Sequence, residues 1–223
     1  GKKMKKTVTM TLLMALLGLI LVSCGKEEKK EELKLEAKAQ GTLIFVLGKV
    51  EVSRDGKEWK TAALNDKVKA GDWILTGAKS QAKIQIWNST SFLVQANTKT
   101  RIETLTSGQQ FALNLEKGSV RCEVEKIAQE KGYYQVKGLA MAAGVRGTQF
   151  DFTSDGEKEV LKVKEGRVAV KRNLEGAPES IVEAGQGAVI SVKENEALKK
   201  KLDGKSKEEQ EKILSVPLKN EAD

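Results

Sequence analysis

The chain has 223 residues, of which 39% are hydrophobic and 31% are charged, and its formal net charge at pH 7 is +8. This composition indicates a globular protein of one or two modest domains with enough apolar residues to bury a core. The sequence contains no histidine and only two cysteines, which do not form a CxxC pair. His-based catalytic triads, His general bases and His metal ligands are therefore excluded, and neither a zinc site nor any other cofactor is expected.

The positive charge does not predict a nucleic-acid partner. Four lysines near the N-terminus, at positions 2, 3, 5 and 6, account for half of the net charge. Elsewhere lysine and glutamate are interspersed, without a basic stripe and with few aromatic residues that could stack on bases. We therefore expect no nucleic-acid binding.

The first predicted segment is a signal peptide over residues 1–23. Met4–Cys24 has a basic start, an apolar run from Leu12 to Val22 and then a small residue, and it is short for a transmembrane helix. Its last four residues, LVSC, resemble the bacterial lipobox, in which the cysteine becomes the first mature residue and its thiol receives a diacylglycerol. The resemblance implies that Cys24 is lipidated. The alternative is an ordinary signal peptide with an incidental cysteine.

Residues 24–41 are predicted to be a charged tether behind this cysteine. The stretch is rich in lysine and glutamate and nearly free of large apolar residues, so we expect it to be solvated. In the lipoprotein sorting rule, an aspartate after the cysteine favours retention in the inner membrane. Gly25 stands at that position. The resemblance therefore implies a lipid-anchored protein of the outer membrane that faces the periplasm.

Residues 42–192 are predicted to form an all-β domain of about a dozen short strands, in a twisted solenoid-like or sandwich arrangement. Apolar residues alternate along the segments, and short GxV-like starts recur at Gly48, Ala82, Gly118, Gly166 and Gly187. We expect turns at Asp55–Gly56, Asn88–Ser89 and Lys117–Gly118.

Two further residue types in this domain have competing interpretations. Cys122 alternates with two valines, which predicts a buried small hydrophobe. The three tryptophans could form an aromatic platform for a sugar or belong to the core. We expect Trp73 and Trp87 in the core and Trp59 as the best candidate for an exposed ring.

Residues 193–223 are predicted to form a short, charged, helical tail. Ser206 and Glu209 match a capping box, and two short helices should be separated by Asp203–Gly204. Pro217 should end the second helix. The tail is either a partner-binding arm or a solvated segment that packs a few leucines on the domain, and we favour the second.

The stretch GVRGTQFDF, Gly144–Phe152, places a permanent charge in a strand-like run. In a regular strand Arg146 shares a face with Phe150 and Phe152, so it points inward unless a glycine bulge changes its face. A buried arginine needs partners, because an unpaired buried charge is costly. We expect a structural latch rather than a catalytic residue, with Asp72 and Glu165 as candidate partners.

Five motifs in order resemble the FecR domain over residues 44–172. They are a GxV opening, a GDxIxTG turn, a GSV strand start, a VRGTxF signature and an EGxVxV strand. The residues that carry them, and that we expect to hold the domain's structural motif, are Gly48, Val50, Gly71, Asp72, Ile74, Thr76, Gly77, Gly118, Ser119, Val120, Val145, Arg146, Gly147, Thr148, Phe150, Glu165, Gly166, Val168 and Val170.

The resemblance implies an all-β periplasmic module. Founding members of the family span the inner membrane once and relay a signal from an outer-membrane iron transporter to a cytoplasmic sigma factor. Here no cytoplasmic anti-sigma region precedes the apolar segment. The resemblance therefore implies a general binding, scaffold or relay role.

Three function classes follow from these patterns. We favour a non-catalytic, lipid-anchored envelope protein that binds another envelope protein, with the run LKVKEGRVAV as a candidate edge for a partner strand. The alternative is a ligand-sensing module or one that binds carbohydrate or peptidoglycan. An enzyme is disfavoured, because the acidic residues are spread among lysines and no acid–base pair stands out.

Overall fold

The computed structural model describes residues 39–87, 90–125, 132–145, 147–215 and 219–222. Residues 39–223 form one compact unit. The signal peptide, Cys24, Arg146 and Pro217 lie outside the described residues, so the expectations about them remain predictions.

The described part of the chain is mostly β, which confirms the predicted fold class. Its strands are β1 (Gly41–Leu47), β2 (Val50–Ser53), β3 (Trp59–Thr61), β4 (Lys67–Val68), β5 (Trp73–Thr76), β6 (Gln81–Gln85), β7 (Ser91–Val94), β8 (Lys99–Leu105), β9 (Gln110–Val124), β10 (Tyr133–Lys137), β11 (Met141–Val145), β12 (Thr148–Ser154), β13 (Lys158–Glu165), β14 (Arg167–Arg172), β15 (Ser180–Glu183), β16 (Gln186–Ser191) and β17 (Lys219–Ala222).

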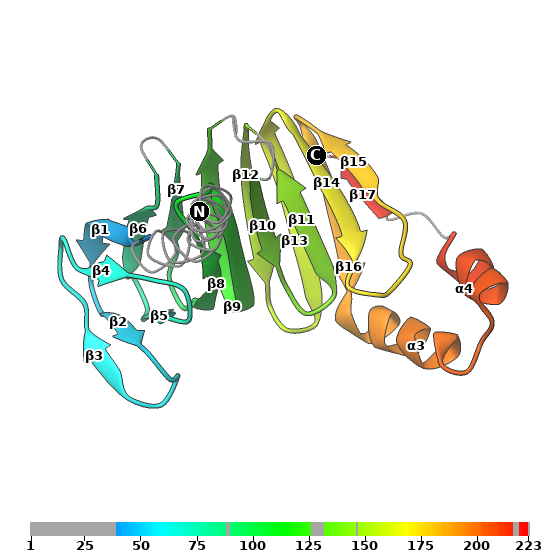
Figure 1. The fold of residues 1–223 in the computed structure, drawn as a ribbon, viewed down its shortest axis with the longest axis horizontal. Coiled ribbons are helices and arrows are strands. Elements are labelled where there is room, and N and C mark those ends of the chain that lie inside the picture. The colour runs from blue at the N-terminus through cyan, green and yellow to red at the C-terminus, as the bar shows by residue number, and fades with distance from the viewer. Residues whose placement is uncertain (1–38, 88–89, 126–131, 146, 216–218, 223) are drawn as a thin grey trace, which may run out of the picture. The chain divides into compact units, whose positions relative to one another are not determined.

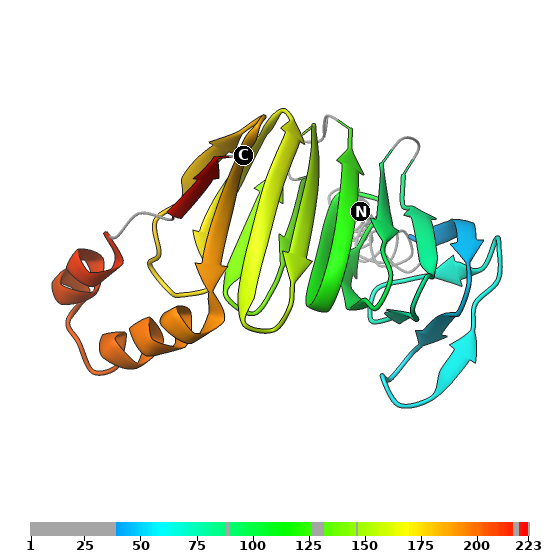
Figure 2. The same ribbon diagram turned by 180° about the vertical axis from the view of Figure 1, so that it is seen from behind.

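The strands form two layers that enclose the core, seen from opposite sides in Figures 1 and 2. Sheet A runs β1–β6–β7–β9–β12–β13–β16–β17, and the short β4 pairs with the start of β1. Sheet B runs β3–β2–β5–β8–β9–β10–β11–β14–β15. From β10 onward the chain makes a hairpin in one sheet and then crosses to the other, so the fold is both solenoid-like and two-layered.

Alternation in the sequence translates directly into burial. In β12, Thr148, Phe150 and Phe152 face the core while Gln149 is exposed, as the period of two predicts. Cys122 is fully buried, which confirms its expected role as a small core residue. Burial raises the pKa of its thiol to about 12.

Three local expectations are wrong. Lys117–Gly118 is not a turn between strands: β9 continues through it, pairing with β8 in sheet B before Gly118 and with β7 and β12 in sheet A after it. GVRGTQFDF is not one regular strand, because β11 belongs to sheet B and β12 to sheet A. LKVKEGRVAV is not an edge, because β13 and β14 each pair on both sides.

The tail contains both predicted helices, α3 (Val192–Leu202) and α4 (Lys207–Leu214). Ser206 and Glu209 form the predicted capping box. Leu202 and Leu214 are buried, in line with a tail that packs leucines on the domain. The tail then returns as β17 to sheet A, where it pairs with β16. That return was not predicted, since four residues are too few to show a strand pattern.

Candidate functional site

The motif glycines lie where the chain passes between the two sheets. Gly118, in the middle of β9, has φ +104 and approaches the turn before β8. A Cβ at this position would lie 2.5 Å from the Thr98 Cα. The Ser119 N–H donates to the Thr98 Oγ1 at 2.9 Å. Glycine is needed here because the bend brings two backbones into contact.

The VRGT and EG motifs meet at a second crossing. Gly166 has φ +79, and a Cβ there would lie 2.7 Å from the Gly147 carbonyl oxygen. The Thr148 Oγ1 donates to the Arg167 carbonyl at 3.0 Å. This contact joins the start of β12 to the start of β14 across the two layers. We name Gly147, Thr148, Gly166 and Arg167 the motif corner.

The GD turn is fixed by a buried carboxylate. Asp72 is buried and accepts the Lys69 N–H at 2.9 Å. One Arg54 nitrogen donates to both of its oxygens, at 2.6 and 2.7 Å. The N–H of Gly71 donates to the Ile102 carbonyl, and that of Gly77 to the Lys49 carbonyl. Asp72 thus has a cation from the β2–β3 turn as its partner.

The remaining motif residues have separate surroundings. Phe150 is in the core, Val145 is buried at the end of β11, and Glu165 is exposed at the end of β13. The structure therefore brings Gly147, Thr148 and Gly166 together and leaves the GD turn elsewhere. These positions hold backbone in place rather than forming a reactive cluster.

A buried acid that sequence reasoning missed closes the β10–β11 turn. Glu159 on β13 is fully buried, and its carboxylate accepts the N–H groups of Leu139, Ala140 (3.0 Å) and Met141 (2.7 Å). Burial raises the pKa of Glu159, and this effect outweighs the backbone hydrogen bonds, which lower it. The signal available in the sequence was that Glu159 falls on the same inward face of the strand as Leu161 and Val163. A buried carboxylate in that position needs hydrogen-bond donors around it.

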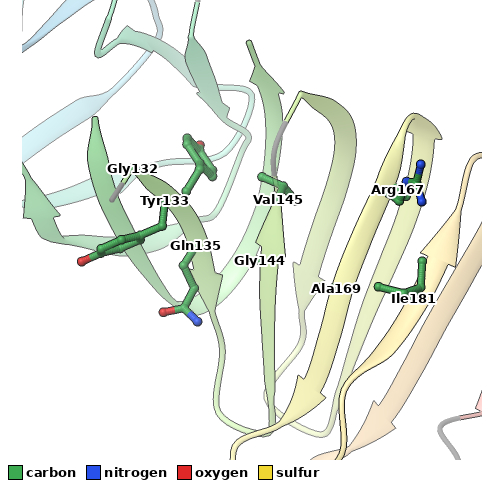
Figure 3. A pocket seen from close by; sticks show the side chains of 9 residues that line it. Gly132, Tyr133, Gln135, Gly144, Val145, Arg167, Ala169 and Ile181 are labelled. Atoms are coloured by element: carbon green, nitrogen blue, oxygen red, sulfur yellow. The ribbon is translucent and has the colours of Figure 1, made fainter. Parts of the chain in front are cut away.

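A furrow crosses the outer face of sheet B, and sequence reasoning missed it as well. Two adjoining hollows, of about 650 and 440 Å³, share Gln135 and follow β10, β11 and β14. Figure 3 shows Tyr133 and Gln135 on one side and Arg167 and Ile181 on the other, with Gly144 and Ala169 between them. The second hollow continues past Ala142 to Lys137, Lys171 and Asn173.

The furrow borders the motif corner, because Arg167 belongs to both. In the described part of the chain, no carboxylate pairs with the side chains of Arg167 or Lys171. Lys137 lies 3.3 Å from Glu103. Glu175 also lines the second hollow. The furrow is therefore open, partly apolar and net positive.

The tryptophans do not gather into a platform. Trp87 packs against the core, edge-on to Phe111, and donates to the Thr106 carbonyl at 3.2 Å. Trp73 is half-buried on sheet B beneath the Lys99 ammonium, 4.7 Å from the ring centre. Trp59, expected to be exposed, is also half-buried.

Two searches of the described residues bear on membrane and metal chemistry. No helix among them is both long and apolar enough to span a bilayer. No group of three or more His, Cys, Asp or Glu side chains in the same residues is placed to hold a metal ion.

Residues 72–169 match the family model described as FecR protein. The chain carries a FecR domain. The matched stretch starts at the buried Asp72 and ends in β14 at Ala169, so it contains both the motif corner and most of the furrow. The FecR domain expected from the motifs is thus confirmed over 72–169, while the expected range 44–172 is wider at its N-terminal side.

Two crystal structures of a candidate anti-sigma factor from Parabacteroides distasonis ATCC 8503 are similar to part of the chain. Both share 15% sequence identity with it, with TM-scores of 0.48 and 0.47. The similar region covers 55% of this chain and 56% of that protein, so the match spans just over half of its length. A search of curated proteins gives no match.

Proposed function

We propose that this protein is a non-catalytic, lipid-anchored component of the bacterial cell envelope whose FecR domain binds an envelope partner and relays a signal. The match of residues 72–169 to the FecR family carries the proposal. The motif residues support a binding role, since they are occupied in holding the two layers together. The lipobox-like LVSC supports an anchor at Cys24 and a domain in the periplasm, at the outer membrane.

The edge of β1 is the surface we assign to a protein partner. Residues 42–47 of β1 pair with β6 on one side, but β4 covers only Gly41 and Thr42 on the other. Ile44, Phe45 and Leu47 are 41%, 43% and 50% exposed along this edge. The Leu43 N–H donates to the Asp66 carbonyl and the Leu43 carbonyl accepts from the Asn65 N–H. In the described part of the chain, the edge from Ile44 to Leu47 has no strand beside it and can pair with an added strand.

The other sheet edges are protected, which distinguishes β1. β3 has three residues and includes Lys60, β15 has four and includes Glu183, and β17 has only four residues. Residues 44–47 carry no charge. An apolar edge without gatekeeping charges fits an extended partner segment with alternating apolar side chains, added by β-augmentation.

Photo-crosslinking in intact envelopes tests this assignment. A benzoylphenylalanine at position 45 is expected to capture one envelope protein, while the same group at the exposed Gln149 of sheet A should not. Phe45→Lys should abolish capture from a probe at position 47, because a charge on the edge opposes strand addition. Capture of a second copy of the chain, or of the same proteins from position 149, would overturn the assignment.

The anchor has an independent test. Cys24→Ser should move the protein from the membrane to the soluble fraction of lysed cells and abolish its labelling by radioactive palmitate. The circular dichroism spectrum and melting temperature of the folded unit should not change. Retention in the membrane fraction would contradict the lipoprotein assignment.

The furrow on sheet B favours a second candidate function. A surface lined by Tyr133, Gln135, Arg167 and Lys171 suits a sensor of carbohydrate or peptidoglycan. This function is compatible with the first, because the furrow lies on sheet B and the partner edge belongs to sheet A.

A further inference from the structure

Gly144 is a glycine that the fold does not require. It lies in the interior of β11, and its φ is not in the left-handed region. Among the described residues, a Cβ added there would meet only the Ala169 carbonyl oxygen, at 3.9 Å. Glycine inside a strand costs roughly 0.5–1 kcal/mol relative to alanine. At Gly118 and Gly166 close backbone contacts account for this cost, but at Gly144 no contact with a described residue does.

The strand register makes this glycine part of the floor of the furrow, which follows β10, β11 and β14 and which we call the channel. Gly144 pairs across the strands with Gln135 of β10 and with Ala169 of β14, and Ala169 pairs with Ile181 of β15. The next residues on the same face of β10 and β14 are Tyr133 and Arg167 in one direction along the strands. In the opposite direction they are Lys137 and Lys171. Long side chains therefore surround a small floor made of Gly144 and Ala169, with Gln135 and Ile181 beside it.

The direction of the channel limits what can occupy it. A peptide strand binds most readily at a sheet edge, where backbone groups are free. In the interior of sheet B, β10, β11 and β14 pair on both sides, so recognition depends on side chains. Tyr133 is 40% exposed and offers an aromatic ring, while Gln135 and Asn114 offer amide groups. Rings and amides of this kind suit the flat faces and hydroxyl groups of sugars.

The charges on the channel walls select the kind of sugar. Arg167 in the first hollow and Lys171 in the second both lie on β14, and neither has a carboxylate partner in the described part of the chain. A ligand with carboxylate groups at intervals would contact both cations, since each would gain a charge-assisted hydrogen bond. A neutral chain would leave both cations without a partner.

We propose that this channel binds an extended glycan that carries carboxylate groups, with Gly144 and Ala169 as the floor beneath the sugar rings. This inference deepens the second candidate function and rests on it. It needs neither the lipid anchor nor the partner edge at β1. Tyr133 stacks on a ring, and Arg167 and Lys171 contact the carboxylates.

The test measures binding of the detergent-solubilised full chain to polygalacturonate and to its methyl ester, which differ only in the free carboxylate. We expect at least about tenfold tighter binding to the acid form, weakening as salt is raised. Gly144→Leu should weaken binding at least about tenfold without lowering the melting temperature, because its side chain fills the channel and not the core. Lys171→Glu should weaken it similarly.

Controls and competing outcomes separate the alternatives. Gln149→Leu, which adds an exposed apolar side chain on sheet A, and Lys193→Glu, on α3, should bind like the wild type. Equal binding of acid and ester, or wild-type binding by Gly144→Leu, would overturn the proposal. Polyglutamate binding with the same sensitivity to Gly144→Leu would replace the glycan with an acidic peptide. Crosslinking from position 45 does not depend on the channel, so it still reports on the partner edge at β1 when the glycan tests fail. The two functions are therefore tested separately.

Discussion

At the residue scale, two glycines with the same backbone angle are expected to differ in importance. Gly166 and Gly185 both have φ +79, but a Cβ at Gly166 would lie 2.7 Å from the Gly147 carbonyl oxygen, while nothing lies within 4 Å of one at Gly185. Gly185→Ala should lower the free energy of unfolding by about 1 kcal/mol, the cost of a left-handed alanine. Gly166→Ala should lower it by about 3 kcal/mol, because the two layers must also separate at the motif corner.

Urea denaturation of both variants checks this difference. Because the backbone angle is matched, the excess cost at Gly166 measures the close contact at the motif corner. Equal costs for the two substitutions would show that the contact with Gly147 contributes nothing.

Glu159 makes the stability of the domain depend on pH. Burial raises the pKa of this group above its ordinary value of 4.5. A raised pKa means that the folded state holds the proton more tightly than the unfolded chain does. The stabilisation is therefore fully present below pH 4.5 and declines as the pH rises through the higher folded value.

Replacing this acid by its amide tests both its hydrogen bonds and its titration. In Glu159→Gln, an NH2 group must face at least one of the three N–H donors of the β10–β11 turn, which should cost about 1–3 kcal/mol. Since glutamine does not titrate, the difference from the wild type should narrow between pH 4 and pH 7 in parallel denaturation series. A difference that widens over this range would contradict the raised pKa.

At the element scale, the sequence predicted burial and helices, which depend on the local residue pattern. It missed the changes of sheet and the channel, which depend on which strands pair with each other. Phe150 and Phe152 face the core and Cys122 is buried, because side chains in a strand alternate whatever the neighbouring strand is. Both tail helices also follow from local signals, including the capping box at Ser206.

The errors occur where the chain changes sheets. Gly118 looks like a turn in the sequence, but β9 keeps its extended backbone through it and bends from one layer into the other. Whether a glycine ends a strand or redirects it depends on Thr98, which is 20 positions away along the chain. The channel was missed for a similar reason, since Gly144 and Ala169 stand side by side only through the β11–β14 register.

At the scale of the whole molecule, the tail closes one end of the layered domain. β17 pairs with β16 and so covers that edge of sheet A, while the buried Leu214 of α4 lies near Gly176 of the β14–β15 connection. The opposite end of sheet A, at β1, has an apolar edge from Ile44 to Leu47 that no described strand covers. The molecule thus has one protected end and one end suited to a partner.

Removing the tail after Leu202 should convert the protected end into a second exposed edge. The loss of β17 leaves the backbone groups of β16 unpaired, and the loss of α4 removes the burial of Leu214, so we expect a melting temperature lower by about 5–10 °C. Light scattering should show association that increases with concentration, because an uncovered strand edge pairs with other chains. Leu214→Ser is the matched variant: it retains the sequence of β17 and should lower the melting temperature without causing association. A truncated chain that melts like the wild type and stays monomeric would mean that β17 does not protect the edge of sheet A.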